Sequence, residues 1–233
     1  MTNEEDTEYP QRTFEPPPGA TELLLIRHGQ SEPARPSAPF PLVDGHSDPA
    51  LSPLGEQQAE HVAGRLCVER FDAIYVTTLR RTVQTAAPLT RRTGLTPLIE
   101  PDLREVHLGE WEGGLFRKMV TDLHPTAIRM WTEERWDVIP GAEPAESFAR
   151  RVSGAIDRLA AAHQGQRLAV FTHGGVIGQV LALASRSRAF AFAGADNASI
   201  SHVVITPQRW IVRRFNDTAH LDPTFSLVPT PLT

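Results

Sequence analysis

The chain reads Glu22-Leu23-Leu24-Leu25-Ile26-Arg27-His28-Gly29 where its first apolar run ends in two basic side chains and a glycine. A short continuous apolar run is typical of a strand that is buried on both faces in a parallel sheet. A similar run, Leu168–Thr172, ends at His173-Gly174-Gly175, and a third, Ala73–Thr77, leads into a pair of arginines. We therefore expect three parallel strands whose polar ends meet at one edge of a sheet, where ligands of such folds bind.

Helical periodicity fills the intervals between these strands. Ser52-Pro53 is a favourable helix start, with serine as the cap and proline in the first turn, and an apolar stripe follows it. Further helices and then two terminal strands are predicted over Arg80–Arg92, Glu146–His163, Val176–Ala184, Ile200–Thr206 and Trp210–Phe215. This alternation predicts an α/β fold in which helices cover both faces of a mostly parallel central sheet, a three-layer α/β/α sandwich.

Charge and composition divide the chain into three parts. The 233 residues carry 23 basic and 28 acidic side chains, and residues 1–20 hold five of the acids against one arginine. Because the body is nearly neutral, a nucleic-acid binder is not expected. Residues 1–20 are also rich in proline, so a disordered leader is predicted. One domain is expected over 21–221, followed by an extended tail over 222–233.

Cysteine content and hydropathy limit the cellular environments in which the protein is expected. The single cysteine, Cys67, excludes an intrachain disulfide and a thiolate-rich zinc site, and it is predicted to be a small buried side chain. No apolar run approaches the roughly 20 residues that span a bilayer. The acidic N-terminus has no apolar core of a secretory signal. We therefore expect a cytoplasmic protein that binds no membrane.

The residues at the predicted sheet edge suit an anion with two charges. A single histidine after a strand is more often a turn residue, but His28 and His173 are expected beside several arginines. Arginine offers a planar fork of donors that matches phosphate oxygens, and helix N-termini after Gly29 and Gly174 would add backbone N–H groups. A neutral imidazole in this setting can attack phosphorus without a metal ion.

Six motifs occur in order along the chain and together carry a family resemblance. They are Leu25–Glu32, Asp44–Ala59, Leu79–Ala86, Leu103–Gly113, Thr172–Gly175 and Asn216–Leu221. With these motifs the sequence resembles the histidine phosphatase superfamily, in its phosphoglycerate mutase-like group. The resemblance implies the fold of that group with a small helical cap insertion, here over 113–140. It also implies a phosphorylated small-molecule substrate, and neither a metal nor an organic cofactor.

The resemblance assigns a role to each matching residue. His28 matches the nucleophile that becomes phosphorylated, and His173 matches the second histidine, which donates to the transferring group. Glu105 matches the proton donor to the leaving oxygen, which later takes a proton from water. The residues that match phosphate ligands are Arg27, Arg81 and Gly174. Arg80 would then be a neighbour of the ligand and not the ligand itself.

The same set of residues serves phosphatases and phosphoglycerate mutases. Mutases usually carry asparagine six residues after the nucleophile, where this chain has Ala34. Only about 35 residues separate Glu105 from Pro140, so the cap is shorter than the mutase insertion that excludes water. A metal-independent phosphomonoester hydrolase is therefore favoured. Mutase-type transfer and a catalytically silent phosphate-binding protein stay as alternatives, and the tail leaves a homo-oligomer possible.

Several other polar and aromatic residues have competing interpretations. Glu110 and Glu112 are predicted to have structural or rim roles, because the motif places the acid at Glu105. His61 and Arg65, one helical turn apart, are predicted to lie on a solvated face. For Trp131 and Trp136, lining of the pocket and simple packing stay equally open.

Overall fold

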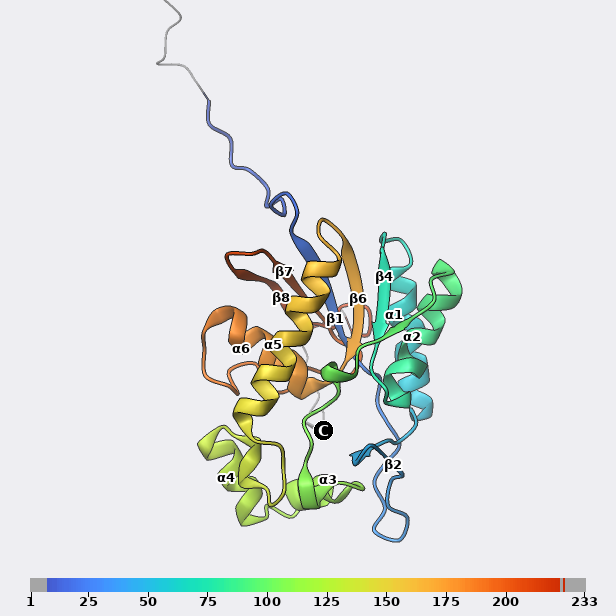
Figure 1. The fold of residues 1–233 in the computed structure, drawn as a ribbon. Coiled ribbons are helices and arrows are strands. Elements are labelled where there is room, and N and C mark those ends of the chain that lie inside the picture. The colour runs from blue at the N-terminus through green and yellow to red at the C-terminus, as the bar shows by residue number, and fades with distance from the viewer. Residues whose placement is uncertain (1–7, 223, 225–233) are drawn as a thin grey trace, which may run out of the picture.

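The structure is a computed structural model that describes residues 8–222 and 224. Its main strands are β1 (Thr21–Arg27), β4 (Ala73–Val76), β5 (Leu98–Ile99), β6 (Arg167–Thr172), β7 (Ile200–Ile205) and β8 (Trp210–Asp217). They form one sheet in the order β5-β4-β6-β1-β7-β8 (Figure 1). Strand β7 is antiparallel to both β1 and β8, and the other pairings are parallel. The predicted mostly parallel central sheet is confirmed.

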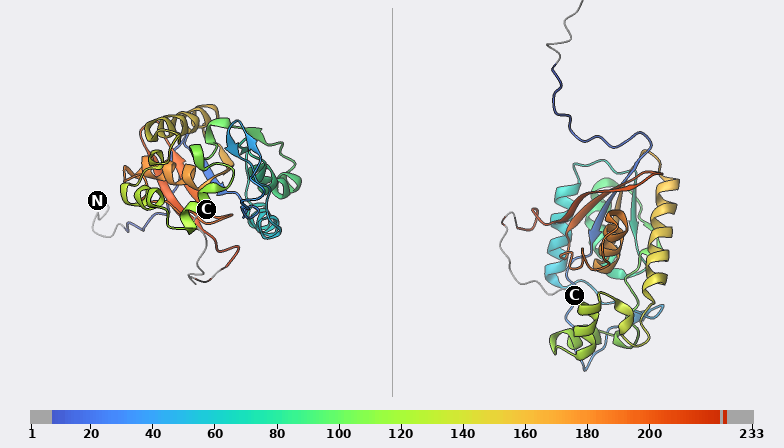
Figure 2. Two further views of the ribbon diagram at one scale, coloured as in Figure 1. Left: turned by 90° about the horizontal axis from the view of Figure 1, so that it is seen from below. Right: turned by 90° about the vertical axis from the view of Figure 1, so that its left-hand side faces the viewer.

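Helices cover both faces of the sheet and give the molecule three layers (Figure 2). They are α1 (Pro53–Leu66), α2 (Arg80–Thr93), α5 (Ala145–Ala162) and α6 (Gly174–Ser185). Residues of β1 alternate between two cores: Leu24 and Ile26 pack with α1 and α2, whereas Leu23 and Leu25 pack with α5 and α6. Burial on both faces explains the unbroken apolar run of this strand. The predicted three-layer α/β/α sandwich is confirmed.

The segment 113–140 forms a small helical unit, here called the cap, beyond the carboxyl ends of the parallel strands (Figure 1). It contains α3 (Leu115–Thr121), α4 (Pro125–Glu133) and the 3-10 turn η4 (Trp136–Val138). Two 3-10 turns, η2 (Pro101–Leu103) and η3 (Gly109–Trp111), lead from β5 to it. An apolar cluster of its own, which includes Phe116 and Met130, holds it together. The cap therefore faces the strand ends that carry the candidate site residues.

The helix expected directly after Gly29 is absent, so that prediction is wrong. Residues 30–52 form a loop that contains the short hairpin β2 (Leu42–Val43) and β3 (His46–Ser47), because its many prolines cannot continue a helix. The next helix, α1, is capped by Ser52, whose Oγ accepts from the Gly55 N–H at 3.2 Å. A Cβ on Gly55 would lie 2.0 Å from the Gln30 carbonyl oxygen. Only glycine lets α1 approach the loop after His28 this closely.

The described N-terminal segment lies apart from the cap. Residues 8–19 form neither helix nor strand and lead away at the opposite end of the molecule (Figure 1). The tail expected over 222–233 and the first seven residues fall almost wholly outside the described residues.

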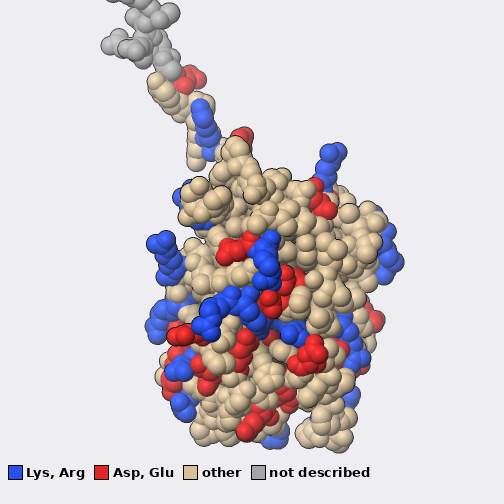
Figure 3. All heavy atoms as spheres, viewed as in Figure 1, with Lys and Arg blue, Asp and Glu red and all other residues tan. Residues whose placement is uncertain are grey.

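No helix in the described part of the chain is long and apolar enough to cross a membrane. The face in Figure 3 mixes acidic and basic side chains. Cys67 is exposed, so its predicted burial is wrong.

Arg65 departs from the predicted solvated face of α1. Its guanidinium forms a two-pronged pair with the Asp217 carboxylate, at 2.7 Å for Nη1 to Oδ1, and it lies 3.1 Å from His220 Nδ1. Only 27% of the Arg65 side chain and 18% of the Asp217 side chain are exposed. The guanidinium lowers the pKa of Asp217 far below its usual range, mainly through these hydrogen bonds. The pair therefore ties α1 to the end of β8, whereas His61 is exposed as predicted.

Arg65→Met is expected to lower the free energy of unfolding by about 1–3 kcal/mol, because the half-buried Asp217 carboxylate loses both hydrogen bonds from Arg65 and keeps only longer ones, from Arg214 at 3.2 Å and from the Ala219 N–H at 3.1 Å. Urea titration followed by circular dichroism measures this loss. The matched control is Arg91→Met, which breaks an ion pair to Glu60 with side chains 66% and 48% exposed, and should cost under about 1 kcal/mol. Equal losses in the two variants would contradict a special role for the Arg65 pair.

Candidate phosphoryl-transfer site

The sheet register brings the two strand-end histidines together. Arg27 at the end of β1 pairs with Thr172 at the end of β6, so His28 and His173 leave the sheet side by side. Both side chains are buried, and their ring centres lie 5.2 Å apart at an angle of 62°. Strand β4 pairs with the other side of β6 and delivers Thr77 to the same edge. Three segments far apart in sequence therefore meet at one point.

The ring of His28 is held by its neighbour in the chain. Its Nδ1 lies 2.7 Å from the Gly29 carbonyl oxygen, which can only accept, so the neutral ring carries its proton on Nδ1 and a lone pair on Nε2. The pKa of His28 lies well below its ordinary value, chiefly because of burial and then because of the Arg81 and Arg27 charges. The side chain is therefore a neutral imidazole with an available nitrogen, as an attacking group requires.

His173 is oriented by a hydroxyl that the motifs did not single out. Its Nε2 lies 3.0 Å from Thr77 Oγ1, which also accepts from the Leu79 N–H and contacts the Thr82 hydroxyl. Burial and the Arg81 charge hold the pKa of His173 well below its ordinary value. Its Nδ1 is buried and has no hydrogen-bond partner in the described part of the protein. This unpaired atom marks a place where a ligand atom is expected.

Arg27, directly before His28 in sequence, and Arg81, at the start of α2, are both buried at the same edge of the sheet. Arg27 donates to the Ala195 carbonyl, and its Nε is buried without a partner in the described residues. Arg81 donates to the Ser47 carbonyl at 2.8 Å, and burial lowers its pKa to about 10. Both guanidiniums hydrogen-bond to backbone carbonyls, and of the carboxylates near them the Glu105 charge acts most strongly on each. Arg80 instead turns to Asp48, with Nε 3.3 Å from Oδ2.

A third guanidinium, Arg117, enters the site from α3 of the cap. It donates to Ser31 Oγ at 2.7 Å and to the Glu32 carbonyl at 2.6 Å, and it lines the same cavity as His28. Its charge contributes to the lowered pKa of Arg27, of His28 and of Arg81. Sequence reasoning missed this residue, because no motif covers the cap and nothing in the pattern of α3 reveals which side chain turns inward.

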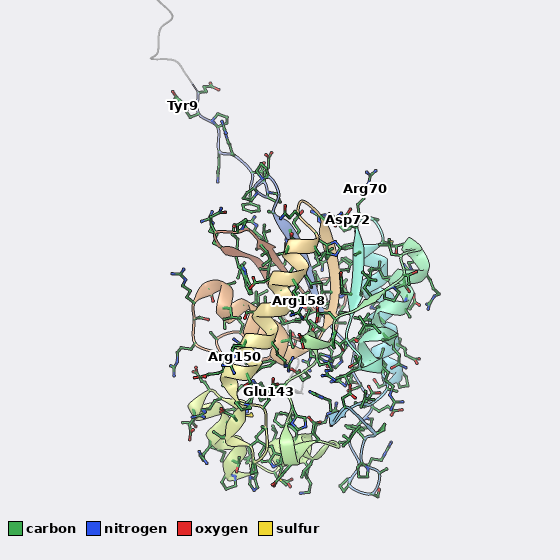
Figure 4. All side chains as sticks on the ribbon, in the orientation of Figure 1. Tyr9, Arg70, Asp72, Glu143, Arg150 and Arg158 are labelled. Carbon is green, nitrogen blue, oxygen red and sulfur yellow. The ribbon has the colours of Figure 1, made fainter. Side chains whose placement is uncertain are left out.

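Glu105 reaches the site from the loop after η2. Its Oε2 accepts from the Gly175 N–H at 3.1 Å, at the N-terminus of α6. A Cβ on residue 175 would lie 2.4 Å from Oε1, so glycine is required there. The loop is held by Arg151, which donates to three backbone carbonyls of residues 102, 104 and 105 and to Glu143, labelled at the lower end of α5 in Figure 4. The carboxyl group is therefore rigidly placed at the cavity wall.

Gly174 also brings the helix start close to an arginine. A Cβ on this residue would lie 3.4 Å from Arg27 Nε, and Gly174 itself begins α6. The backbone N–H groups at the start of a helix attract anions, so α6 adds positive potential beside the two histidines. All six residues that the motifs single out, namely Arg27, His28, Arg81, Glu105, His173 and Gly174, lie at this one edge of the sheet, and all but His173 line the cavity.

The remaining candidates separate into two kinds. Glu112 accepts from the backbone N–H groups of Ser47 and Leu108, each at 2.8 Å, and so joins the hairpin to the segment that leads into the cap. Glu110 is exposed. Trp131 and Trp136 line the cavity and also pack within the cap cluster, so both of the open interpretations hold at once.

The two buried neutral histidines make stability depend on pH. Because their folded pKa values lie below the ordinary 6.5, the unfolded chain binds protons there that the folded protein does not. Stability should thus fall as pH drops below about 6.5, by up to about 1.4 kcal/mol per pH unit for each histidine. Urea titrations at several pH values between 7 and 5 give the free energy of unfolding as a function of pH. This free energy should depend less steeply on pH in His173→Gln than in the wild type, and equally steeply in the exposed-site control His61→Gln. The same pH dependence of the free energy of unfolding in all three proteins would contradict this account.

The site thus joins two buried neutral histidines and two buried arginines with a half-buried third arginine and a half-buried carboxyl group, a set that suits phosphate chemistry. Comparisons with known proteins give the class. The model of the histidine phosphatase superfamily (branch 1) matches residues 23–218. The chain belongs to this superfamily and is a phosphatase.

Known relatives agree with this assignment. A metal-independent phosphoserine phosphatase of Arabidopsis thaliana is 32% identical over 86% of this chain and 83% of its own. A mycobacterial glucosyl-3-phosphoglycerate phosphatase is similar in structure, with a TM-score of 0.70 and 28% identity over 84% of this chain and 98% of its own. A phosphoglycerate mutase from Bacillus anthracis shares the fold, with a TM-score of 0.73 and 21% identity over 87% of this chain and 96% of its own.

Proposed function

We propose that the protein is a metal-independent phosphomonoester hydrolase that works through a phosphohistidine on His28. The observation that carries this proposal is the hydrogen bond from His28 Nδ1 to the Gly29 carbonyl at 2.7 Å, in a ring that burial and two guanidiniums keep neutral. This arrangement leaves Nε2 ready to attack phosphorus. The named relatives include a metal-independent phosphatase, which supports hydrolysis without a metal ion.

Two balanced steps follow from the arrangement. In the first, Nε2 of His28 forms a bond to phosphorus, the ester P–O bond breaks, and the Glu105 carboxyl group gives its proton to the leaving oxygen. In the second, the Glu105 carboxylate takes a proton from water, whose oxygen attacks phosphorus and releases His28 and inorganic phosphate. Arg27, Arg81 and the Nδ1 atom of a His173 that carries a proton there stabilise the oxygen charge throughout.

Hydrolysis is favoured over mutase-type transfer by the size of the cap. The cap comprises two short helices and one 3-10 turn, and the aromatic and charged residues behind it line a cavity that reaches the surface at exposed Arg135. Water can therefore reach the phosphorylated histidine. A silent binding protein is disfavoured because the attacking nitrogen, the acid and the arginines are all present in one cavity.

Trapping the intermediate tests the proposed function. The protein is mixed with 4-nitrophenyl phosphate in EDTA and quenched in alkali, which preserves phosphohistidine, and peptide mass spectrometry locates the phosphoryl group. We expect it on the peptide that contains His28, and we expect added ethanol to divert a constant fraction of phosphate to ethyl phosphate whichever ester is supplied. Loss of turnover in EDTA, or a diverted fraction that changes with the ester, would overturn a metal-free common intermediate.

The proposal also covers the domain boundaries, the cellular location and the oligomeric state of the protein. We propose a single catalytic domain over 21–221 between a leader at 1–20 and a tail at 222–233, in a cytoplasmic protein that acts on small phosphate esters and not on nucleic acid. Light scattering on the full chain, compared with a chain that ends at residue 221, tests whether the tail joins subunits into a homo-oligomer.

A further inference from the structure

The cavity continues from the phosphate-binding residues to a wall of aromatic side chains, here called the aromatic wall: Phe40, Trp131, Trp136 and Phe190. They come from the loop after His28, from the cap and from the loop after α6, so the wall bridges the body and the cap. Trp131 and Phe190 meet edge to face with ring centres 5.5 Å apart, and Trp136 and Phe190 lie 4.9 Å apart. All four side chains keep part of their surface open.

The two ends of the cavity differ in their lining residues, which are cationic at one end and aromatic at the other. Arg117 donates to Ser31, and its guanidinium carbon lies 5.2 Å from the centre of the Phe40 ring, so this third cation stands where the wall meets the phosphate-binding residues. Beside the aromatic wall, the charged lining residues are already paired: Arg135 Nε lies 2.6 Å from an Asp137 oxygen, and Glu134 lies 3.0 Å from Arg188 Nε. Beyond Phe40, the part of the cavity beside Trp131, Trp136 and Phe190 presents apolar rings, and the charged lining residues there, Glu134 and Arg135, are paired.

A carboxylate next to Trp131, Trp136 and Phe190 would lose water without gaining a partner, which is costly. An aromatic or similarly large apolar group would instead bury its surface and meet the rings at favourable angles. The α6 side of the cavity carries Gly174, Gly175 and Gly178 and the neutral Gln179, so it adds no charged side chain to the lining.

We propose that the substrates are phosphate monoesters of alcohols that carry an aromatic ring or an apolar group of similar size, which lies against the aromatic wall. This substrate class rests on the proposed function, since it describes the leaving group of the same reaction. It differs from phosphoserine and from phosphoglycerates, whose leaving groups carry a carboxylate.

Three esters of similar alkyl alcohols test the proposal: 2-phenylethyl phosphate, ethyl phosphate and phosphoserine. We expect kcat/KM for the phenylethyl ester to exceed that for the ethyl ester by about 10- to 100-fold, the value of burying one phenyl group, and phosphoserine to be no better than the ethyl ester. A ratio near one, or a preference for phosphoserine, would overturn the proposal while leaving the phosphohistidine reaction intact.

Variants locate the preference on the wall. Trp131→Ala and Phe190→Ala should each reduce the phenylethyl-to-ethyl ratio at least threefold while kcat/KM for the ethyl ester changes little. Ile128→Ala is the matched control, because Ile128 is 53% exposed on the same helix as Trp131 and does not line the cavity. A ratio that survives both wall variants would contradict this location, and thermal melting shows that each variant is folded.

A binding measurement separates this proposal from the proposed function. Calorimetry compares 2-phenylethylphosphonate with ethylphosphonate, two analogues that cannot be hydrolysed. At least about tenfold tighter binding of the phenyl analogue is expected even if the protein turns over none of the esters. Equal affinities would overturn the substrate class.

Discussion

His28→Ala is expected to lower kcat/KM for every phosphate ester by at least about 1,000-fold, because it removes the atom that bonds to phosphorus and no nearby group can replace it. His173 is the nearest imidazole, but its Nε2 is engaged by Thr77 at 3.0 Å, and its ring centre lies 5.2 Å from that of His28. Steady-state assays in EDTA with 4-nitrophenyl phosphate measure the loss. The alkali-stable phosphoryl group should disappear from the protein at the same time.

The control for His28→Ala is the same substitution at His61, an exposed histidine on α1, which should keep full activity. The variant must also be shown to bind the product, since a collapsed site would lose activity for another reason. The arginines remain in His28→Ala, so inorganic phosphate should still raise its melting temperature. Activity within tenfold of the wild type in a folded His28→Ala protein would rule out the phosphohistidine route.

The sheet edge could be predicted from the sequence because local signals and topology agree there. An apolar strand followed by Arg27-His28-Gly29 and another followed by His173-Gly174-Gly175 are each ambiguous alone. Since parallel strands end on the same side of a sheet, the two histidines must lie close together, and the register of β1 with β6 makes them neighbours. The central sheet and the meeting of His28, His173 and the strand-end arginines follow from this pattern, whereas the role of Glu105 follows only from the family resemblance.

Residues placed by packing between distant segments could not be predicted in this way. Arg117 and the aromatic wall depend on how the cap lies over the sheet edge, which no periodicity in α3 or α4 encodes. Thr77 orients His173 through a single hydroxyl, and its position at a strand end carries no special signal. Arg65 pairs with Asp217 across 152 residues, so the pattern of α1 alone predicted a solvated face. The prolines after Gly29, by contrast, were visible in the sequence and should have excluded a helix there.

Glu105→Gln is expected to have the second-largest effect, and the size of the effect should depend on the leaving group. For an alkyl ester the variant should lose about 100- to 1,000-fold in kcat/KM, because an amide cannot protonate the departing alkoxide. For 4-nitrophenyl phosphate, whose leaving group is stable without a proton, kcat/KM should fall less than about tenfold. The amide oxygen can keep the contact with the Gly175 N–H, but the amide nitrogen cannot accept from the Val106 N–H as Oε1 does, so thermal melting must show that the variant is folded.

The same variant should slow the second step for every substrate, because the carboxylate also takes the proton from water. With 4-nitrophenyl phosphate, Glu105→Gln should therefore release one equivalent of nitrophenol rapidly and then accumulate phosphorylated His28, which rapid mixing and alkaline quenching both detect. Glu110→Gln, an exposed carboxylate five residues away, is the control and should behave as the wild type. An equal loss for both kinds of ester, with no burst, would mean that Glu105 holds the site in shape without moving a proton. Another residue of the cavity would then have to supply the proton. Glu112 is poorly suited to this role, because its carboxylate accepts hydrogen bonds from the Ser47 and Leu108 N–H groups.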